Sequence, residues 1–202
     1  MSLRKLANRF GTSPMPVRAA LTRLVVTNAL EEAPNGTVRV PRLTGDRLTE
    51  LFAVRRLLEG MATEAACRHV TPELLETLTK QNDELLAALD RREAVACLSA
   101  NQRFHFTLYE AAKSTVLMPL IESLWLQFGP TMYLSLDSTL YPWDATAHFD
   151  ILQGLKDNNP ELARKGILKD IEHTGRALKA ASDEPDMLTK LSGSDSDLYF
   201  GQ

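Results

Sequence analysis

The sequence predicts a mostly α-helical protein in two parts: two short helices and a hairpin, followed by an all-α antiparallel bundle of about six helices. Three observations predict this class. Apolar residues recur at helical spacing through most segments, prolines stand where helices open, and the clearest strand signal is a single short hairpin. The composition, 44% hydrophobic and 24% charged over 202 residues, is that of an ordinary globular protein.

Residues 1–43 carry the signals for the two short helices and the hairpin. Ser2 opens a helix over residues 3–10, and Gly11 ends it. Ser13 caps a second helix that has prolines in its first turn, where no backbone donor is missed. The turn Pro34-Asn35-Gly36 lies between apolar ends, and Asn-Gly favours a tight hairpin because both central residues need a positive φ. This order of elements is the outline of a winged helix-turn-helix.

From residue 44 to residue 182 the pattern is helical throughout. Apolar stripes predict six helices, over about 46–70, 72–89, 93–112, 115–129, 143–157 and 160–182. Gly129-Pro130 should kink or stop the fourth helix, because an interior proline loses a hydrogen bond. Asn159-Pro160 opens the sixth helix, so the last two form an antiparallel hairpin. Residues 183–202, rich in Ser, Asp and Gly, are expected to form a flexible tail.

Charge is distributed unevenly along the chain. The formal net charge is −3, but residues 1–43 carry seven basic and two acidic groups, a charge of +5, which leaves −8 for the rest. A small basic part on an acidic body favours a polyanionic partner at one end; chance clustering is the alternative. No apolar run reaches the roughly 18 residues that span a bilayer, and Cys67 and Cys97 form no metal or disulfide motif. We therefore expect a soluble, cytoplasmic protein without membrane contact.

Polar residues gather where the predicted bundle helices should face one another. Asn101 and His105 are four residues apart, so they project from one face of their helix. Counting along the antiparallel hairpin at about 1.5 Å per residue places Asp170 level with His148, and His173 nearly one turn deeper. Two imidazoles, a carboxylate and an amide oxygen would form a mixed site suited to a divalent metal such as Zn, Ni or Mn. Open positions on that metal would accept the oxygens of a small organic acid.

Other interpretations of these residues stay open. Each histidine taken singly could be a hydrogen-bonded residue between helices, although the shared level and the four-residue spacing favour a site. Arg55 and Glu59 are likewise four residues apart. They form either a solvated salt bridge worth less than about 1 kcal/mol or, if Arg55 faces the cavity, a clamp whose guanidinium holds a ligand carboxylate.

Six short motifs resemble the GntR family of bacterial transcription regulators, in the FadR branch with a helical, FCD-type effector domain. They follow the family's order and spacing: Ser2–Ala7, Phe10–Ser13, Pro16–Leu21, Arg55–Glu59, Asn101–His105 and Ala147–Leu152. The resemblance spans about residues 2–182. It implies a winged helix-turn-helix DNA-binding domain over 1–43, without the family's first helix through a truncated or shortened start, and an effector-binding and dimerisation domain over 44–182.

The resemblance also implies partners. A homodimer would place two recognition helices in successive major grooves of a palindromic operator. Five side chains would contact the double-stranded DNA, mostly at phosphates: Arg4, Arg9, Ser13, Arg18 and Arg39. Because Pro14-Met15 replaces the family's usual Arg-Thr, Arg4 and Arg18 are the main contacts carried over. A small carboxylic acid bound to the metal and to Arg55 and Glu59 would favour one arrangement of the bundle and so change operator binding.

Two departures from the family pattern fall in the expected site. Asn101 stands where the family usually has an aspartate, and Asp170 where it has its last histidine, so a carboxylate has moved from the third bundle helix to the sixth. The charge is kept and one imidazole is lost. This exchange implies a metal site of altered strength or preference, with His173 as an alternative ligand.

Two other functions are the alternatives to a ligand-responsive transcription regulator. A site of two histidines and one carboxylate also occurs in metal-dependent enzymes that act on small carboxylates. The sequence has no HExxH or similar motif to supply a general base, so we do not expect an enzyme. A dimeric metal- or ligand-binding module without DNA affinity is the second alternative, which the short N-terminal part would favour.

Overall fold

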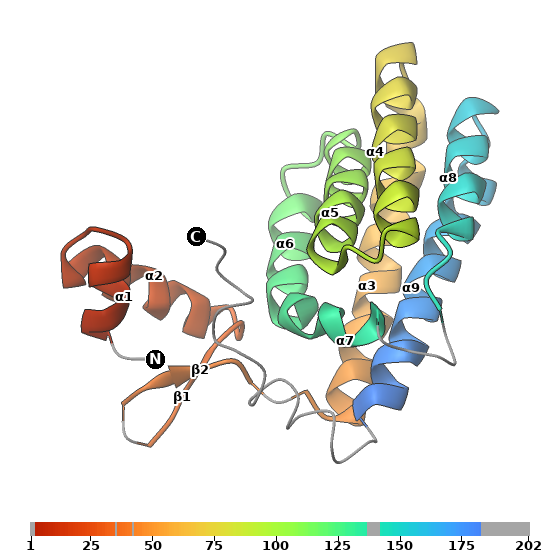
Figure 1. Cartoon of the computed structure of the whole chain (residues 1–202). Helices are drawn as coiled ribbons and strands as arrows, with labels where there is room; N and C mark the ends of the chain where they lie inside the picture. The colour runs from red at the N-terminus through yellow and green to blue at the C-terminus, as the bar shows by residue number, and fades with distance from the viewer. Residues whose placement is uncertain (1–2, 35, 42, 137–141, 183–202) are drawn as a thin grey trace.

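The computed structural model describes residues 3–34, 36–41, 43–136 and 142–182, and its mostly helical structure confirms the predicted fold class (Figure 1). The chain has two parts. The first, called the head below, contains two helices and a two-stranded sheet, and the second is a helical bundle that begins at Thr44. The head elements are α1 (Leu3–Arg9), α2 (Pro14–Val26), β1 (Glu31–Glu32) and β2 (Val38–Arg39).

Local sequence accounts for the helix pair and hairpin of the head. Gly11 follows α1 with a φ of +59°, a conformation that glycine adopts without strain. Ser13 precedes α2 as its N-cap residue and Pro14 opens the helix, but the Ser13 side chain does not accept the expected capping hydrogen bond within the described backbone. The two strands pair antiparallel; Asn35, in the predicted turn between them, lies outside the described residues.

The bundle contains the predicted helices and one more. Its elements in the described residues are α3 (Gly45–Ala66), the 3-10 turn η1 (Cys67–His69), α4 (Pro72–Asp90), α5 (Ala94–Glu110), α6 (Leu117–Phe128), the 3-10 turn η2 (Gly129–Thr131), α7 (Met132–Leu136), α8 (Thr146–Lys156) and α9 (Pro160–Ser182). Each of these helices is too short or too polar to cross a lipid bilayer.

Several predicted helices differ in their bounds from the structure; the first bundle helix, expected over 46–70, ends at Ala66 and continues as the 3-10 turn η1. The expected fourth helix stops at Gly129-Pro130, as predicted, but the chain continues through η2 into the short helix α7, which the sequence did not predict. The expected fifth helix begins at Thr146 rather than at residue 143. Ala145 has a φ of 53°, and the backbone N–H of Thr146 donates to Asp144 Oδ1 at 3.0 Å. A left-handed residue followed by this capping contact delays the helix start.

The helices α8 and α9 pack closely against each other. In the bundle, α9 lies between α3 and α8, and α4 packs against α5 (Figure 1). A Cβ at Gly154 of α8 would lie 2.3 Å from the backbone nitrogen of Ala163 on α9, and one at Gly166 would lie 2.8 Å from Ile151. Glycine at these positions lets the two helix backbones meet. The close approach brings the inward side chains of α8 and α9 within contact of each other.

Candidate metal centre

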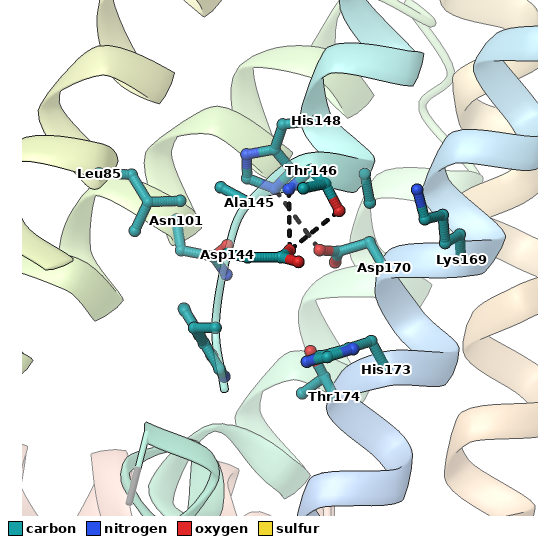
Figure 2. A pocket seen from close by; sticks show the side chains of 12 residues that line it. Leu85, Asn101, Asp144, Ala145, Thr146, His148, Lys169, Asp170, His173 and Thr174 are labelled. Atoms are coloured by element: carbon teal, nitrogen blue, oxygen red, sulfur yellow. Dashed lines mark hydrogen bonds and ion pairs between the residues drawn. The ribbon is translucent and has the colours of Figure 1, made fainter. Parts of the chain in front are cut away.

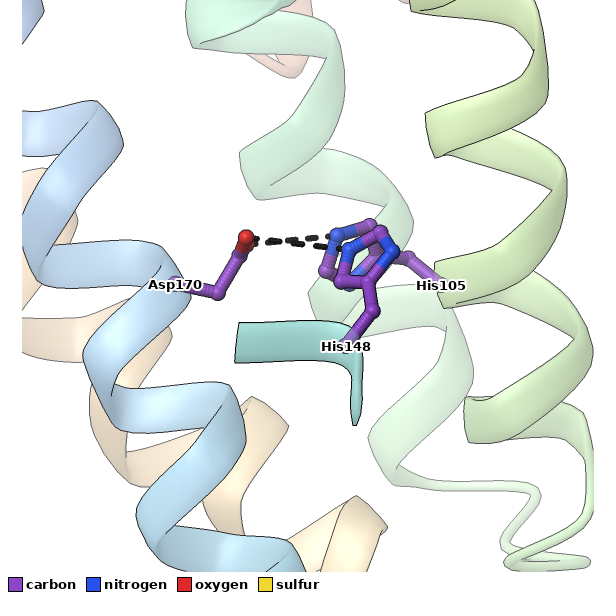
Figure 3. A group of neighbouring side chains, drawn as sticks. All are labelled: His105, His148 and Asp170. Carbon is purple, nitrogen blue, oxygen red and sulfur yellow. Dashed lines mark ion pairs between the residues drawn. The ribbon is translucent and has the colours of Figure 1, made fainter. Parts of the chain in front are cut away.

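Three side chains from three helices converge inside the bundle. They are His105 on α5, His148 on α8 and Asp170 on α9, which point toward one another in Figure 3. His105 Nε2 lies 3.3 Å from Asp170 Oδ2, and His148 Nε2 lies 3.6 Å from Asp170 Oδ1. Candidate ligand atoms of all three lie within 4.8 Å of one another. Both imidazoles are buried, and the carboxylate side chain is 19% exposed.

The hydrogen bonds behind the imidazoles direct their Nε2 atoms into the cluster. His148 Nδ1 lies 2.9 Å from Asn82 Oδ1, an acceptor, so this nitrogen carries the proton. His105 Nδ1 lies 3.0 Å from the hydroxyl oxygen of Tyr109. Both Nε2 atoms are buried and have no hydrogen-bond partner within the described part of the chain. Two inward nitrogen lone pairs beside a carboxylate form a donor set that fits a divalent metal.

A chain of buried polar groups continues from His105 to α3. The Tyr109 hydroxyl donates to Glu59 Oε2 at 2.5 Å. Arg55 donates to the same carboxylate twice, from Nε at 2.6 Å and from a terminal nitrogen at 3.1 Å. Its guanidinium carbon lies 3.9 Å from the centre of the Phe128 ring. A paired, hydrogen-bonded charge stacked on an aromatic ring is the form in which arginine is tolerated in a core.

This burial overturns the solvated salt bridge as an interpretation of Arg55 and Glu59, because their side chains are 2% and 0% exposed. The clamp expectation required Arg55 to face the ligand cavity. Neither residue is among those lining the cavity beside His148 and Asp170. The pair instead lies behind His105, connected to it through Tyr109.

Burial and neighbouring charges shift the pKa values of His148, Asp170 and Tyr109. Burial lowers the pKa of His148 from 6.5 to about 4, a change that Asp170 opposes and His105 reinforces, so the imidazole is neutral near pH 7. Burial alone would raise the pKa of Asp170, but His105, His148 and Arg55 together lower it, so this carboxyl group is ionised. Burial and then the charge of Glu59 raise the pKa of Tyr109 well above its ordinary value, which keeps the phenol protonated.

A cavity of about 40 Å³ adjoins the cluster, more than a single water molecule needs (Figure 2). His148 and Asp170 line it together with polar residues from α5, α8, α9 and the segment before α8: Asn101, Asp144, Thr146, Lys169, His173 and Thr174. Asn101 is buried, as its spacing from His105 predicts. His173 Nε2 lies 3.1 Å from the carbonyl oxygen of Pro142, to which it donates, and His173 is not part of the three-residue cluster.

Sequence reasoning missed the two residues that orient the histidines. Tyr109 could have been found, because it lies four residues after His105 on the same face of α5. Asn82 had no such signal, since it reaches His148 from α4 across 66 positions of sequence. Phe104 adds a third constraint, because its ring is stacked on that of His148 with centroids 4.0 Å apart.

The residues expected to contact DNA lie on the surface of the head. Arg4, Arg9, Ser13 and Arg18 are exposed on or beside α1 and α2. Arg39 lies in β2, where its Nε is 2.5 Å from Glu31 Oε1 while its side chain stays 68% exposed. The structure thus distributes these five residues over the helix pair and the hairpin rather than burying any of them.

In this protein a winged helix-turn-helix head is joined to a helical domain whose apolar core encloses a buried polar cluster. Residues 50–173 match the FCD domain family. The chain is 31% identical over 165 residues to the HTH-type transcriptional regulator McbR of Escherichia coli, covering 80% of this chain and 74% of McbR. It is 29% identical over 167 residues to a probable D-xylose utilization operon transcriptional repressor of Paenarthrobacter nicotinovorans, covering 81% and 72%.

A solved structure agrees with these sequence matches. The structure of E. coli McbR, also called YncC, superposes with a TM-score of 0.81 at 28% identity, covering 89% of this chain and 86% of that one. The chain therefore belongs to the GntR family of transcriptional regulators, in the group that carries an FCD domain. This result confirms the resemblance found in the sequence motifs.

Proposed function

We propose that this chain is a ligand-responsive transcriptional regulator: its head binds operator DNA as part of a homodimer, and its bundle binds a divalent metal and a small organic acid. The observation that carries the proposal is the buried cluster, in which two imidazole nitrogens without hydrogen bonds face an ionised carboxylate. Without a cation, this arrangement would leave buried polar atoms unsatisfied. Membership of a family of transcriptional regulators supports the DNA-binding part.

The metal would be held by His105, His148 and Asp170. Their mixed nitrogen and oxygen donors would suit Zn, Ni or Mn. Asn101 would provide an amide oxygen from the cavity wall. When bound, the ion supplies open coordination positions for the carboxylate and hydroxyl oxygens of the acid. The small cavity limits the effector to a compact molecule.

Arg4, Arg9, Ser13, Arg18 and Arg39 would contact the DNA. Most of these contacts would go to phosphates, which position the head without reading sequence. A dimer would place two heads on half-sites about 34 Å apart, so a palindromic operator is expected. A DNA-binding protein of this kind would act in the cytoplasm.

A physical connection between the two activities runs through α9 and α3. Asp170 lies on α9, which packs along α3, and α3 begins a few residues after the hairpin of the head. A ligand that prefers one position of α9 would therefore favour one position of α3 and of the attached head. Such coupling requires different affinities for the two arrangements, since equal affinity shifts neither population.

The proposal is tested with purified protein and DNA from upstream of its own gene. Zinc content, thermal shift with a set of small carboxylic acids, and operator binding are compared for the parent, His105→Ala and His148→Ala. We expect the parent to bind zinc and to be stabilised by at least one acid that also changes its DNA affinity. Both variants should lose the zinc and the stabilisation. Equal zinc content and equal stabilisation in all three proteins would contradict the proposed site.

A metal-dependent enzyme is the alternative that the same donor set suggests, because two histidines and one carboxylate also occur in catalytic sites. The relatives are transcriptional regulators, which favours ligand sensing. Turnover of any stabilising acid by the zinc-loaded parent, measured by product formation, would support the enzyme instead.

A further inference from the structure

We propose that Tyr109 is a positioning residue: held by the buried Glu59–Arg55 pair, it keeps His105 in the tautomer whose Nε2 lone pair faces Asp170 and His148. The inference rests on the proposed metal site and assigns a role to residues outside it. It also gives Arg55 and Glu59 a function that requires no contact with an effector.

The direction of the hydrogen bonds follows from the number of protons in the chain. An ionised carboxylate can only accept, and Glu59 accepts twice from Arg55. The single proton of the Tyr109 hydroxyl therefore goes to Glu59, 2.5 Å away. The tyrosine oxygen is left with lone pairs toward His105 Nδ1 at 3.0 Å, so Nδ1 must be the donor. A neutral imidazole has one N–H, and its Nε2 is then unprotonated.

The competing tautomer of His105 would place a proton on the nitrogen that faces the site. If His105 carried its proton on Nε2, that proton would face Asp170 Oδ2, 3.3 Å away. The two groups would satisfy each other by a hydrogen bond, and His105 would have no inward lone pair to offer a metal, which would leave His148 Nε2 as the remaining imidazole donor. The Tyr109 oxygen prevents this by stabilising the proton on the far side of the ring. The same logic applies to metal-ligating histidines in general, whose second nitrogen donates to a fixed acceptor.

Arg55 fixes the direction of these hydrogen bonds. Both oxygens of Glu59 face donors, Oε1 the Arg55 Nε and Oε2 a terminal nitrogen of Arg55 and the Tyr109 hydroxyl, so the carboxylate is placed only to accept. The guanidinium holds both oxygens of Glu59 and is itself fixed against the ring of Phe128. The buried ion pair therefore acts on the cluster at a distance of two hydrogen bonds.

The test is Tyr109→Phe, which removes the hydroxyl and keeps the ring. Tyr133→Phe is the matched control, because it removes a hydroxyl from an exposed tyrosine on α7. Zn(II) affinity is measured by competition with a chromophoric chelator, and the His105 tautomer of the metal-free proteins by ¹⁵N imidazole chemical shifts. We expect Tyr109→Phe to weaken zinc binding by about 10- to 100-fold and to shift His105 toward the Nε2–H form. Tyr133→Phe should change neither.

The outcomes separate this inference from the proposed function. Unchanged zinc affinity and an unchanged Nδ1–H tautomer in Tyr109→Phe would overturn the positioning role. A parent that binds no zinc would overturn the metal site, while the ¹⁵N shifts would still decide the tautomer. If Tyr109→Phe does not fold by circular dichroism, the parent spectrum alone decides, because an Nε2–H signal from His105 in the metal-free parent contradicts the inference.

Discussion

The head and the bundle place arginine in opposite environments. In the head, Arg18 is exposed, and Arg39 keeps a side chain that is 68% exposed although it pairs with Glu31. In the bundle, Arg55 is 2% exposed, and Glu59 matches its charge at 2.6 Å. The exposed arginines of the head can attract a polyanion by their charge alone. The buried arginine of the bundle depends on the position of its partners, because a buried charge is stable only when it is paired.

Ionic strength should separate the two regions most strongly. Raising the salt concentration from about 50 to about 200 mM should weaken operator binding by at least about 10³-fold if a dimer neutralises six or more phosphates, because the released counterions oppose binding. Zinc binding should change by less than about threefold over this range, since buried charges are little screened. Fluorescence anisotropy of labelled operator DNA and zinc competition measure the two responses. A parallel loss of both affinities would remove the distinction between the regions.

The geometry of the bundle could largely be predicted because helices are rigid. A fixed rise per residue is enough to place His148 and Asp170 level across a hairpin, and the two side chains lie 3.6 Å apart in the structure. The spacing of Asn101 and His105 likewise predicts a shared face, and both are buried. The helical pattern also predicts the fold class and most helix bounds.

The partners of these residues could not be predicted, because they depend on rotation and packing of whole helices. The spacing of Arg55 and Glu59 shows that they share a face of α3 but not that this face is buried. Asn82 reaches His148 only through the packing of α4 against α8. His173 bonds to the carbonyl oxygen of Pro142, in a segment without regular structure whose course follows no periodicity. In the head, the residues expected to contact DNA are exposed, so no burial pattern in the sequence indicates where their side chains lie.

Acid should destabilise the metal-free bundle through His148. Its pKa falls from 6.5 to about 4 on folding. Between these values the unfolded chain binds a proton that the folded protein excludes, so stability is lost as the pH falls from about 6.5 to about 4. The expected loss from this group is about 3 kcal/mol, at 1.36 kcal/mol per unit. Urea unfolding in the presence of a chelator at several pH values measures it.

His148→Gln is the control for the acid experiment, because it keeps a neutral polar side chain but cannot titrate. The difference in unfolding free energy between parent and variant should shrink by about 3 kcal/mol across this window. Asp170 contributes outside it, since its lowered pKa affects stability only below the ordinary aspartate value. Parallel stability curves for the two proteins would show that His148 does not carry the effect.

The smallest expected effect comes from Asn82→Leu, which tests orientation within the bundle without changing any charge. Leucine keeps the branching at Cγ but removes the acceptor for His148 Nδ1, so the imidazole would favour the Nε2–H tautomer and bind Asp170 instead of a metal. Zinc affinity should fall by about tenfold. Gln81→Leu is the matched control, because Gln81 is the adjacent amide on α4 and donates to Thr107 Oγ1 rather than to a histidine. If both variants bind zinc with the same affinity as the parent, the hydrogen bond from His148 to Asn82 is not needed to orient His148. A tenfold loss of zinc affinity confined to Asn82→Leu shows that the buried amide of Asn82 orients this ligand.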